Sequence, residues 1–385
     1  MEMIPPRLRS LRAQFAKVAQ EVLAPKAAYV DKHAVWPKHS FDALAEAGLM
    51  GLVVPRRAGG LEESFTALVM ATEALARGCC SSALCYGMHC VGAAVIAAKA
   101  TKAQDERYLR PIAQGRHITT LALSESGHGS HVYLAETTLT QKDDGFYVNG
   151  TKQFVTNGGH AHSYVVTTQA SRSNESGEFS CVVVDADAPG LTWLEPWNGM
   201  GLRGNSSRGL RMDEARISSE SLLGEEGDEI WYFFQILAPH FLLAMAGTYA
   251  GIADAALANA MDHVQARTFS HSGESLARVT TIQDKVAELW MDLQKTRLLI
   301  YRAADLADMK DPGAMEAILA SKVSAGDTAL RVTGEAMALC GGIGYRENSI
   351  LARLLRDAHA APVMSPTANL LRLWIGRSLL GLPLL

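Results

Sequence analysis

The stretch Phe146-Tyr-Val-Asn-Gly-Thr-Lys-Gln-Phe-Val-Thr-Asn157 decides the fold, because it interrupts a chain that otherwise has a helix-like composition. Its aromatic and β-branched residues favour strands, and Asn149-Gly150 is typical of a two-residue hairpin turn. Similar short segments surround it from residue 119 to residue 217, with turn residues such as Asp143-Asp144-Gly145 between them. Short strands at regular spacing predict a β-sandwich or barrel.

Alanine- and leucine-rich segments with helical periodicity lie on both sides of these strands. In the first part, Leu8, Leu11 and Phe15 keep a helical spacing, and Ser40 is predicted to cap a helix through FDALAEAGLMGL. Further helices are expected in ESFTALVMATEALARG, in CVGAAVIAAKA and over residues 101–114. After the strands, long helices are expected over residues 229–267, with a kink or restart at Pro239, and over 276–309, 313–339 and 350 to the end.

The order of these segments predicts a mostly α protein with an inserted β-domain. The predicted boundaries give an N-terminal helical domain over residues 1–118, a middle β-domain over 119–226 and a C-terminal helical domain over 227–385. A literal GxGxxG runs from Gly199 to Gly204, but a dinucleotide-binding fold needs a strand before this motif and a helix after it. The residues after Gly204 are typical of loop and strand, so a Rossmann fold is rejected.

Composition excludes several classes of function. The 36 basic and 40 acidic residues give a net charge of -4, which does not favour nucleic acid as a partner. No apolar run reaches spanning length without an interruption, so no membrane segment is expected. The N-terminus is basic and amphipathic, as transit peptides are, but its periodicity continues into later sequence and predicts a first folded helix.

The six cysteines are scattered without CxxC pairs, which argues against a disulfide framework or a zinc site. Cys85 and Cys90 flank His89, but the run SSALCYGMHCVGAAVIAA around them is apolar and helix-like, so packed core thiols are the better interpretation. No metal is therefore expected. Free thiols fit a reducing compartment, and the predicted location is cytoplasmic.

Six stretches, in order and in register, resemble the acyl-CoA dehydrogenase family over nearly the whole chain. They are LMGLVVPRRAGG (49–60), LALSESGHGS (121–130), GTKQFVTNGG (150–159), WNGMGLRGNSSRGLRM through ISSESLLGEEGD (197–228), QARTFSHSGESLARVTTIQDKVAEL (265–289), and ALCGGIGY followed by RLLRDAH (338–359). The resemblance implies an N-terminal helical domain, a middle β-domain and a C-terminal four-helix bundle. It also implies FAD, a homotetramer or homodimer, α,β-dehydrogenation of an acyl-CoA or acyl-carrier thioester, and electron-transfer flavoprotein as a partner.

The resemblance assigns five residues to the flavin ring. Phe154 fills the position that stacks on the ring. Thr156, expected on the same face of a strand, and Ser124 reach the polar edge of the ring with their hydroxyls. Leu121 and Leu123 are expected to line the same site.

Other assignments concern the rest of the cofactor and the substrate. Arg267 matches an arginine that meets the FAD pyrophosphate of a neighbouring subunit, an interaction suited to a guanidinium fork. Gly341 and Gly342 fall where the backbone approaches the adenosine diphosphate, and Thr367 matches a further cofactor contact. Ser130 matches a position near the thioester end of the substrate.

The chain departs from the family at the catalytic base. Dehydrogenation needs a base for the proton α to the thioester carbonyl, normally a glutamate that precedes Gly-Thr. Ser365-Pro366-Thr367 aligns with that segment, and a serine hydroxyl is far too weak a base unless another group activates it. The family's alternative glutamate position falls in QILAPHFLLAMAG, which has His240 but no carboxylate. The other histidines that qualify by pKa type are His128, His131, His160, His162 and His359.

Three interpretations therefore remain open. The first is an acyl thioester dehydrogenase with an unconventional base, whose catalytic residues are unknown apart from the candidate His240. The second is a flavin-dependent monooxygenase or N-hydroxylase on the same fold, which abstracts no α-proton. The third is a non-catalytic subunit of a hetero-oligomer, which contributes Arg267 and packing to the FAD of a partner.

Overall fold

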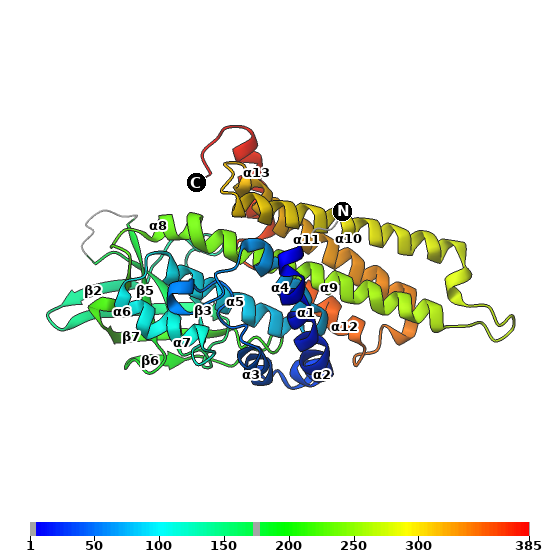
Figure 1. Cartoon of the computed structure of the whole chain (residues 1–385), viewed down its shortest axis with the longest axis horizontal. Helices are drawn as coiled ribbons and strands as arrows, with labels where there is room; N and C mark the ends of the chain where they lie inside the picture. The colour runs from blue at the N-terminus through cyan, green and yellow to red at the C-terminus, as the bar shows by residue number, and fades with distance from the viewer. Residues whose placement is uncertain (1–4, 172–177, 385) are drawn as a thin grey trace.

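The computed structural model describes residues 5–171 and 178–384 and has three parts in the predicted order. Figure 1 shows the strands at one end of an elongated molecule, the longest helices at the other, and the N-terminal helices beside the place where they meet. The mostly α architecture with an inserted β part is confirmed. The residue boundaries of the three domains stay a prediction.

The N-terminal part is helical because its apolar residues recur at helical spacing and are buried together. Its helices are α1 (Arg9–Val18), α2 (Ala24–His33), α3 (Lys38–Glu46), α4 (Phe65–Gly78), α5 (Cys80–Ala98), α6 (Lys102–Gln104) and α7 (Arg110–Ala113). The predicted cap at Ser40 is wrong, because α3 begins at Lys38. The Ser40 hydroxyl is buried and lies 2.9 Å from the hydroxyl of Ser82 instead.

The β part has two four-stranded sheets. One has the order β1 (Thr119–Ala122), β4 (Ser163–Gln169), β5 (Phe179–Asp185) and β8 (Leu222–Leu223), with β1 parallel to β4. The other has the order β2 (Thr138–Lys142), β3 (Gly145–Val155), β7 (Arg208–Ile217) and β6 (Leu191–Trp193). β7 follows the GxGxxG run, where a dinucleotide-binding fold would need a helix.

The predicted hairpin turn at Asn149-Gly150 is wrong. β3 runs through both residues, and its register against β7 shifts between Val148 and Gly150. A Cβ atom on Gly150 would stand 2.5 Å from the Thr137 hydroxyl oxygen, so the glycine permits a close approach at a bulge. The hairpin lies instead between β2 and β3, at Asp143-Asp144.

The described C-terminal part contains three long helices and three shorter ones. α8 (Glu229–Tyr232) continues through a π-helical turn (Phe233–Leu237) into α9 (Ala238–Ala266), so the helix restarts beside Pro239 as expected. α10 (Thr280–Asp308) and α11 (Ala314–Cys340) are the other long helices. The single helix expected from residue 350 onward is wrong: a loop over 359–367, with two prolines that lack a helical N–H donor, separates α12 (Ile350–Ala358) from α13 (Ala368–Leu379).

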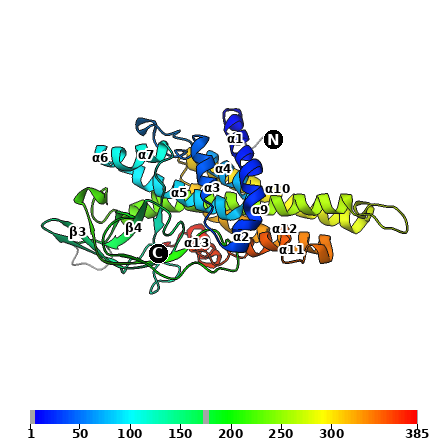
Figure 2. The same cartoon turned by 90° about the horizontal axis from the view of Figure 1, so that it is seen from below.

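Two apolar helices, α5 and α9, form the centre of the molecule, as both views of the ribbon show (Figures 1 and 2). The expectation about spanning length needs correction, because Cys80–Ala98 and Glu229–Ala266 are long and apolar enough to cross a membrane. Within the protein, however, 94% and 83% of their most apolar windows are buried. Burial in the core accounts for this composition.

The six cysteines are free and buried, which confirms the interpretation as core thiols. His89, which lies between two of them, forms a hydrogen bond through each of its ring nitrogens. Its Nε2 is 3.0 Å from the Met50 carbonyl oxygen, and its Nδ1 accepts the Thr119 N–H at 3.2 Å. Burial lowers the pKa of His89 to about 4, so the ring is a neutral structural group at physiological pH.

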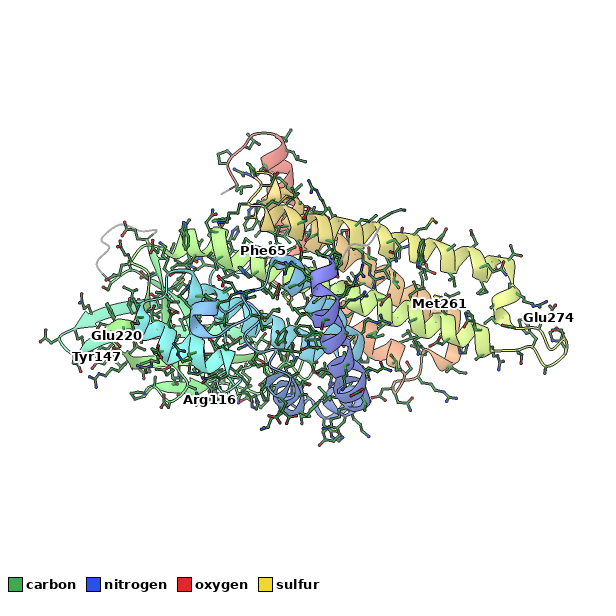
Figure 3. The ribbon with its side chains drawn as sticks, in the orientation of Figure 1. Phe65, Arg116, Tyr147, Glu220, Met261 and Glu274 are labelled. Atoms are coloured by element: carbon green, nitrogen blue, oxygen red, sulfur yellow. The ribbon has the colours of Figure 1, made fainter. Side chains whose placement is uncertain are left out.

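Asp308, at the end of α10, caps the N-terminus of α4. The Asp308 carboxylate accepts hydrogen bonds from the N–H of Phe65 at 2.7 Å, the N–H of Thr66 at 3.1 Å and the Thr66 hydroxyl at 2.8 Å. The first N–H groups of a helix have no partner inside the helix, and the helix dipole favours negative charge there. Figure 3 labels Phe65 at this junction, where the N-terminal helices meet the bundle.

Replacing Asp308 by alanine removes these three hydrogen bonds. We expect the free energy of unfolding to fall by about 1–2 kcal/mol, measured by urea denaturation followed by circular dichroism. Asp305→Ala on the same helix is the matched control, because its exposed ion pair with Arg302 contributes little. Equal effects of the two substitutions would contradict the capping role.

Candidate active site

A cavity of about 320 Å³ lies where the three parts of the chain meet. Its walls come from β1 and the loop after it, the end of β3, the segment before β7, α5, the start of α9, and the loop 359–367. The residues that the sequence assigned to the site and that line this cavity are Leu121, Leu123, Ser124, Phe154, Thr156 and Ser365. The structure therefore brings the flavin-ring candidates together with the residue at the base position.

Most polar residues of the cavity lie on its β-domain wall, and Ser365 lies on the loop 359–367. The Thr156 hydroxyl is 3.1 Å from that of Ser207, which sequence reasoning did not single out. Thr156 lies just after β3, which ends at Val155 following a second register shift, so its expected place within a strand is wrong. The Ser124 carbonyl accepts the N–H of Gln153 at 2.7 Å, and this bond fixes the loop after β1 against β3.

Phe154 presents an aromatic ring from an unusual backbone position. Its φ is 54°, in the left-handed region that bulky residues rarely adopt, and the residue is 65% exposed. The ring of Trp197 meets it edge-on, with centroids 6.3 Å apart, and the Trp197 N–H donates to the Leu202 carbonyl at 3.1 Å. Strain of this kind clusters at ligand sites, and the exposed ring face is available to a planar ligand.

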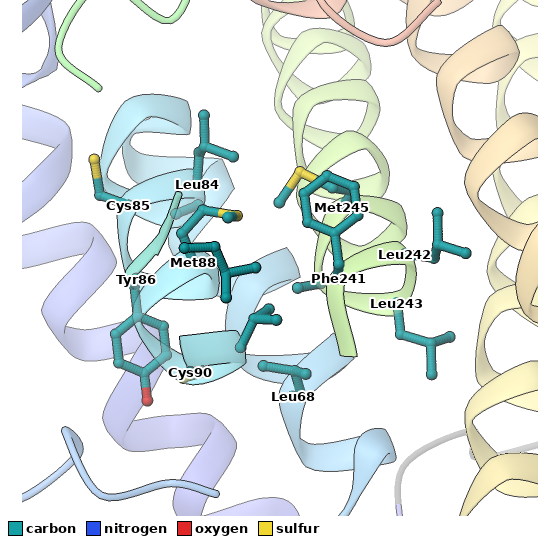
Figure 4. Packing of buried hydrophobic residues seen from close by; sticks show 14 of the residues in the cluster. Leu68, Leu84, Cys85, Tyr86, Met88, Cys90, Phe241, Leu242, Leu243 and Met245 are labelled. Atoms are coloured by element: carbon teal, nitrogen blue, oxygen red, sulfur yellow. The ribbon is translucent and has the colours of Figure 1, made fainter. Parts of the chain in front are cut away.

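The opposite end of the cavity is apolar. Leu84 and Met88 come from α5, and Leu237 and Phe241 come from the start of α9 and the turn before it. Figure 4 shows Leu84 and Met88 on one helix facing Phe241 and Met245 on the other. Sequence reasoning missed these residues, because cavity and core positions share the same helical pattern.

Titratable side chains do not line this cavity. Among the residues that the structure describes, the lining contains no Asp, Glu, His, Lys, Arg, Cys or Tyr. The candidate His240 lies outside it: Nδ1 is 2.6 Å from the Ile236 carbonyl oxygen, and the ring packs on Phe65 at 4.4 Å. Burial lowers the pKa of His240 to about 4. The other five histidine candidates also lie outside the lining.

A buried ion pair supports the β-domain wall from behind. The Lys152 ammonium donates to Glu125 at 2.5 Å, to the Thr167 hydroxyl at 3.0 Å and to the Leu123 carbonyl at 3.3 Å. Burial raises the pKa of Glu125, but the Lys152 ammonium lowers it by more. The pKa of Glu125 therefore lies below its ordinary value. The pair holds the backbone of Leu123, which lines the cavity, against β3.

Five other predicted residues lie outside the cavity of this chain. Arg267 follows α9, and Gly341 and Gly342 follow α11, at the bundle end far from the strands; Figures 1 and 3 show this end, marked by Glu274. Thr367 caps α13 and lies beside Ser130, with their hydroxyl oxygens 3.5 Å apart. The assigned roles of all these residues, Ser130 included, stay predictions.

The cavity suits the ring of a flavin. That ring is planar and largely apolar with polar edges, so it needs apolar faces and a few well-placed hydrogen-bonding groups. Phe154 and Trp197 supply aromatic surface, and Ser124 and Thr156 supply hydroxyls on one wall. The residues present therefore fit the isoalloxazine of FAD.

Three family models match consecutive segments of the chain. They describe the N-terminal domain of acyl-CoA dehydrogenase over residues 5–116, its middle domain over 120–215 and its C-terminal domain over 240–380. The mitochondrial short-chain specific acyl-CoA dehydrogenase of Bos taurus is 32% identical, covering 98% of this chain and 91% of that protein. Cyclohex-1-ene-1-carbonyl-CoA dehydrogenase of Syntrophus aciditrophicus is 31% identical, covering 94% and 87%.

Solved structures agree with these matches. Butyryl-CoA dehydrogenase of Megasphaera elsdenii has a TM-score of 0.92 at 27% identity, covering 98% of this chain and 99% of that one. A chain of the structure described as the electron transferring flavoprotein of Acidaminococcus fermentans has the same TM-score and identity, covering 98% of each chain. The resemblance read from the six sequence stretches is confirmed, and this chain belongs to the acyl-CoA dehydrogenase family.

Proposed function

We propose that this chain binds FAD in the 320 Å³ cavity and dehydrogenates an acyl thioester there, between its α and β carbons. The observation that carries the proposal is the meeting, in one cavity, of a wall suited to a flavin ring with an apolar end from α5 and α9. Membership of a family of oxidoreductases that act on CH–CH donors supports it.

Each wall of the cavity has a role in this proposal. FAD, when bound, accepts the hydride that leaves the β-carbon. Phe154 covers a face of the ring, and the hydroxyls of Thr156 and Ser124 bind its polar edge. Met88 and Phe241 surround the acyl chain and keep water from it. Electron-transfer flavoprotein is the proposed acceptor of the electrons, as the resemblance implies.

The remote cofactor residues point to an assembly of several subunits. Arg267, Gly341 and Gly342 lie at the bundle end far from the cavity of their own chain. We therefore propose that they serve the cofactor of a second copy, in a homotetramer or homodimer. A guanidinium fork suits a pyrophosphate, and glycines allow the backbone to approach it.

The unusual feature of this reaction is the acceptor of the substrate's α-proton. Dehydrogenation takes a hydride and a proton from the substrate, and no described side chain of the lining titrates. Ser365 lines the cavity at the base position, but its hydroxyl is too weak a base to take an α-proton. A neutral water molecule is no stronger a base than this hydroxyl, so we expect slow turnover unless the α-hydrogen of the substrate is acidic.

Anaerobic addition of an acyl-CoA with an uncharged acyl group to the FAD-loaded protein is expected to bleach the flavin absorbance. Butyryl-CoA is expected to react at least about tenfold faster than glutaryl-CoA, because the apolar lining has no cation for a terminal carboxylate. Stopped-flow absorbance measures both rates. Failure of every chain length to bleach the bound flavin would overturn the proposal.

A carboxylate restored at the base position is expected to accelerate flavin reduction. In an apolar cavity the pKa of a glutamate rises and the group becomes a stronger base, so Ser365→Glu is expected to raise the anaerobic rate about 100-fold or more. Ser365→Ala is the control and is expected to leave the rate within about twofold, because the serine is not the base. Loss of reduction in the alanine variant would contradict the assignment.

One observation favours a second candidate function, a flavin-dependent monooxygenase or N-hydroxylase. Such an enzyme abstracts no α-proton, which agrees with a lining that has no titratable side chain among the described residues. With a separate flavin reductase and NADH, this candidate predicts product only in the presence of oxygen. Product formed without oxygen would exclude it and favour dehydrogenation.

A further inference from the structure

The loop 359–367 is one of the parts of the cavity wall without regular secondary structure. It joins α12 to α13 and contributes Met364, Ser365 and Pro366 to the lining. Regular elements hold their carbonyl groups by their own hydrogen bonds, but carbonyls in such a loop need other partners when they are buried. The position of Ser365 in the cavity therefore depends on what binds the loop from behind.

Lys322 of α11 binds the loop from behind. Its side chain is fully buried, and its ammonium donates to the carbonyls of Ala361 at 2.9 Å, Met364 at 3.0 Å and Pro366 at 3.1 Å. The last two carbonyls belong to the residues on either side of Ser365. All three N–H donors of the ammonium are therefore used on one loop.

α11 and the loop are also in close contact. One turn after Lys322, a Cβ atom on Gly326 would stand 2.8 Å from the Cβ of Ala361. The missing side chain lets the loop lie directly on the helix. Tyr249 of α9 holds the other side, with its hydroxyl 3.9 Å from the Met364 sulfur.

We propose that Lys322 is a positioning residue: its ammonium fixes the loop that carries Ser365 and so sets the shape of the cavity where substrate and cofactor meet. Only the expected effect of Lys322 on turnover rests on the proposed function. Its effect on the loop itself is independent of any substrate. Hydrogen bonds from a charged donor are stronger than neutral ones, which suits a single side chain that holds several carbonyls.

The charge state of Lys322 gives the loop a pH dependence. An ammonium has three donors and a neutral amine has two, so deprotonation breaks at least one of the three bonds. Burial and the nearby Arg372 lower the pKa of Lys322 to about 8, against the opposing effect of Asp327. Because the folded-state pKa lies below the ordinary one, the ammonium is present below about pH 8 and is lost as the pH rises through it.

The charged groups nearest to Lys322 form an ion pair with each other. Arg372 of α13 is ion-paired with Asp327 of α11 at 2.6 Å. Facing α11 from α10, Thr296 hydrogen-bonds Ser324 and Thr328 and does not titrate.

Tyr249 and Asp357 are buried titratable groups on the remaining helices, α9 and α12, that pack on α11. Burial raises the pKa of Tyr249 on α9, so it stays neutral. Burial also raises the pKa of Asp357 on α12, to about 6, so this carboxyl has already ionised below pH 8.

Hydrogen–deuterium exchange of the full-length protein, measured by mass spectrometry, tests the inference. In Lys322→Met the charge is lost while most of the side-chain volume stays, and peptides covering 359–370 are expected to lose at least about tenfold in protection. Lys295→Met on α10 is the matched control, because that lysine is mostly exposed and pairs with Asp292. Unchanged protection of the loop in Lys322→Met would overturn the proposal.

Wild-type protein tests the same inference without a variant, should Lys322→Met fail to fold. Protection factors of peptides 359–370, corrected for intrinsic exchange, are expected to fall between pH 7 and pH 9, while those of α4 peptides stay constant. A flat profile in the loop would contradict the proposal. Neither readout needs an acyl substrate, so loss of the proposed dehydrogenase function would not be mistaken for loss of the positioning role.

Discussion

The structure depends on the close approach of α9 to the N-terminal helices. Glycines in α9 make this possible: a Cβ atom on Gly247 would stand 2.3 Å from the Thr72 hydroxyl oxygen, and one on Gly251 would stand 2.4 Å from the Glu73 carbonyl oxygen. Helices that approach this closely are fixed in position along their length. Because α9 starts at the cavity and ends at the far end of the bundle, its position determines both places.

The same packing explains why the cavity is apolar and why its chemistry is restricted. α5 and α9 are buried on nearly every side, so the side chains that they turn toward the cavity are those of a hydrophobic core. Such walls suit an acyl chain and a flavin ring, but they offer no proton acceptor. The charged groups stand behind the walls instead, with Lys152 against the β-domain wall and Lys322 against the loop. Both stabilise backbone that lines the cavity rather than reacting atoms.

The sequence predicted the order of the three parts and most helices, because long amphipathic or apolar runs are strong local signals. It failed where the signal was short or was overridden by tertiary contacts. Asn149-Gly150 has the composition of a turn, but the adjacent chain at Thr137 requires a glycine within a continuous strand. Ser40 has the composition of a cap, but its hydroxyl is buried against Ser82. The break between α12 and α13 was missed although Pro362 and Pro366 mark it.

The candidate site was predictable where the resemblance to the family assigned a position, as with Phe154, Thr156 and Ser365. Its apolar end and its support by Lys322 were not, because they depend on which helix faces meet. We propose that this cavity holds the flavin of FAD. The absorption spectrum of the purified protein, with mass analysis of the released cofactor, tests it most directly. We expect one FAD per chain. A protein that purifies without flavin and takes up no added FAD would contradict it.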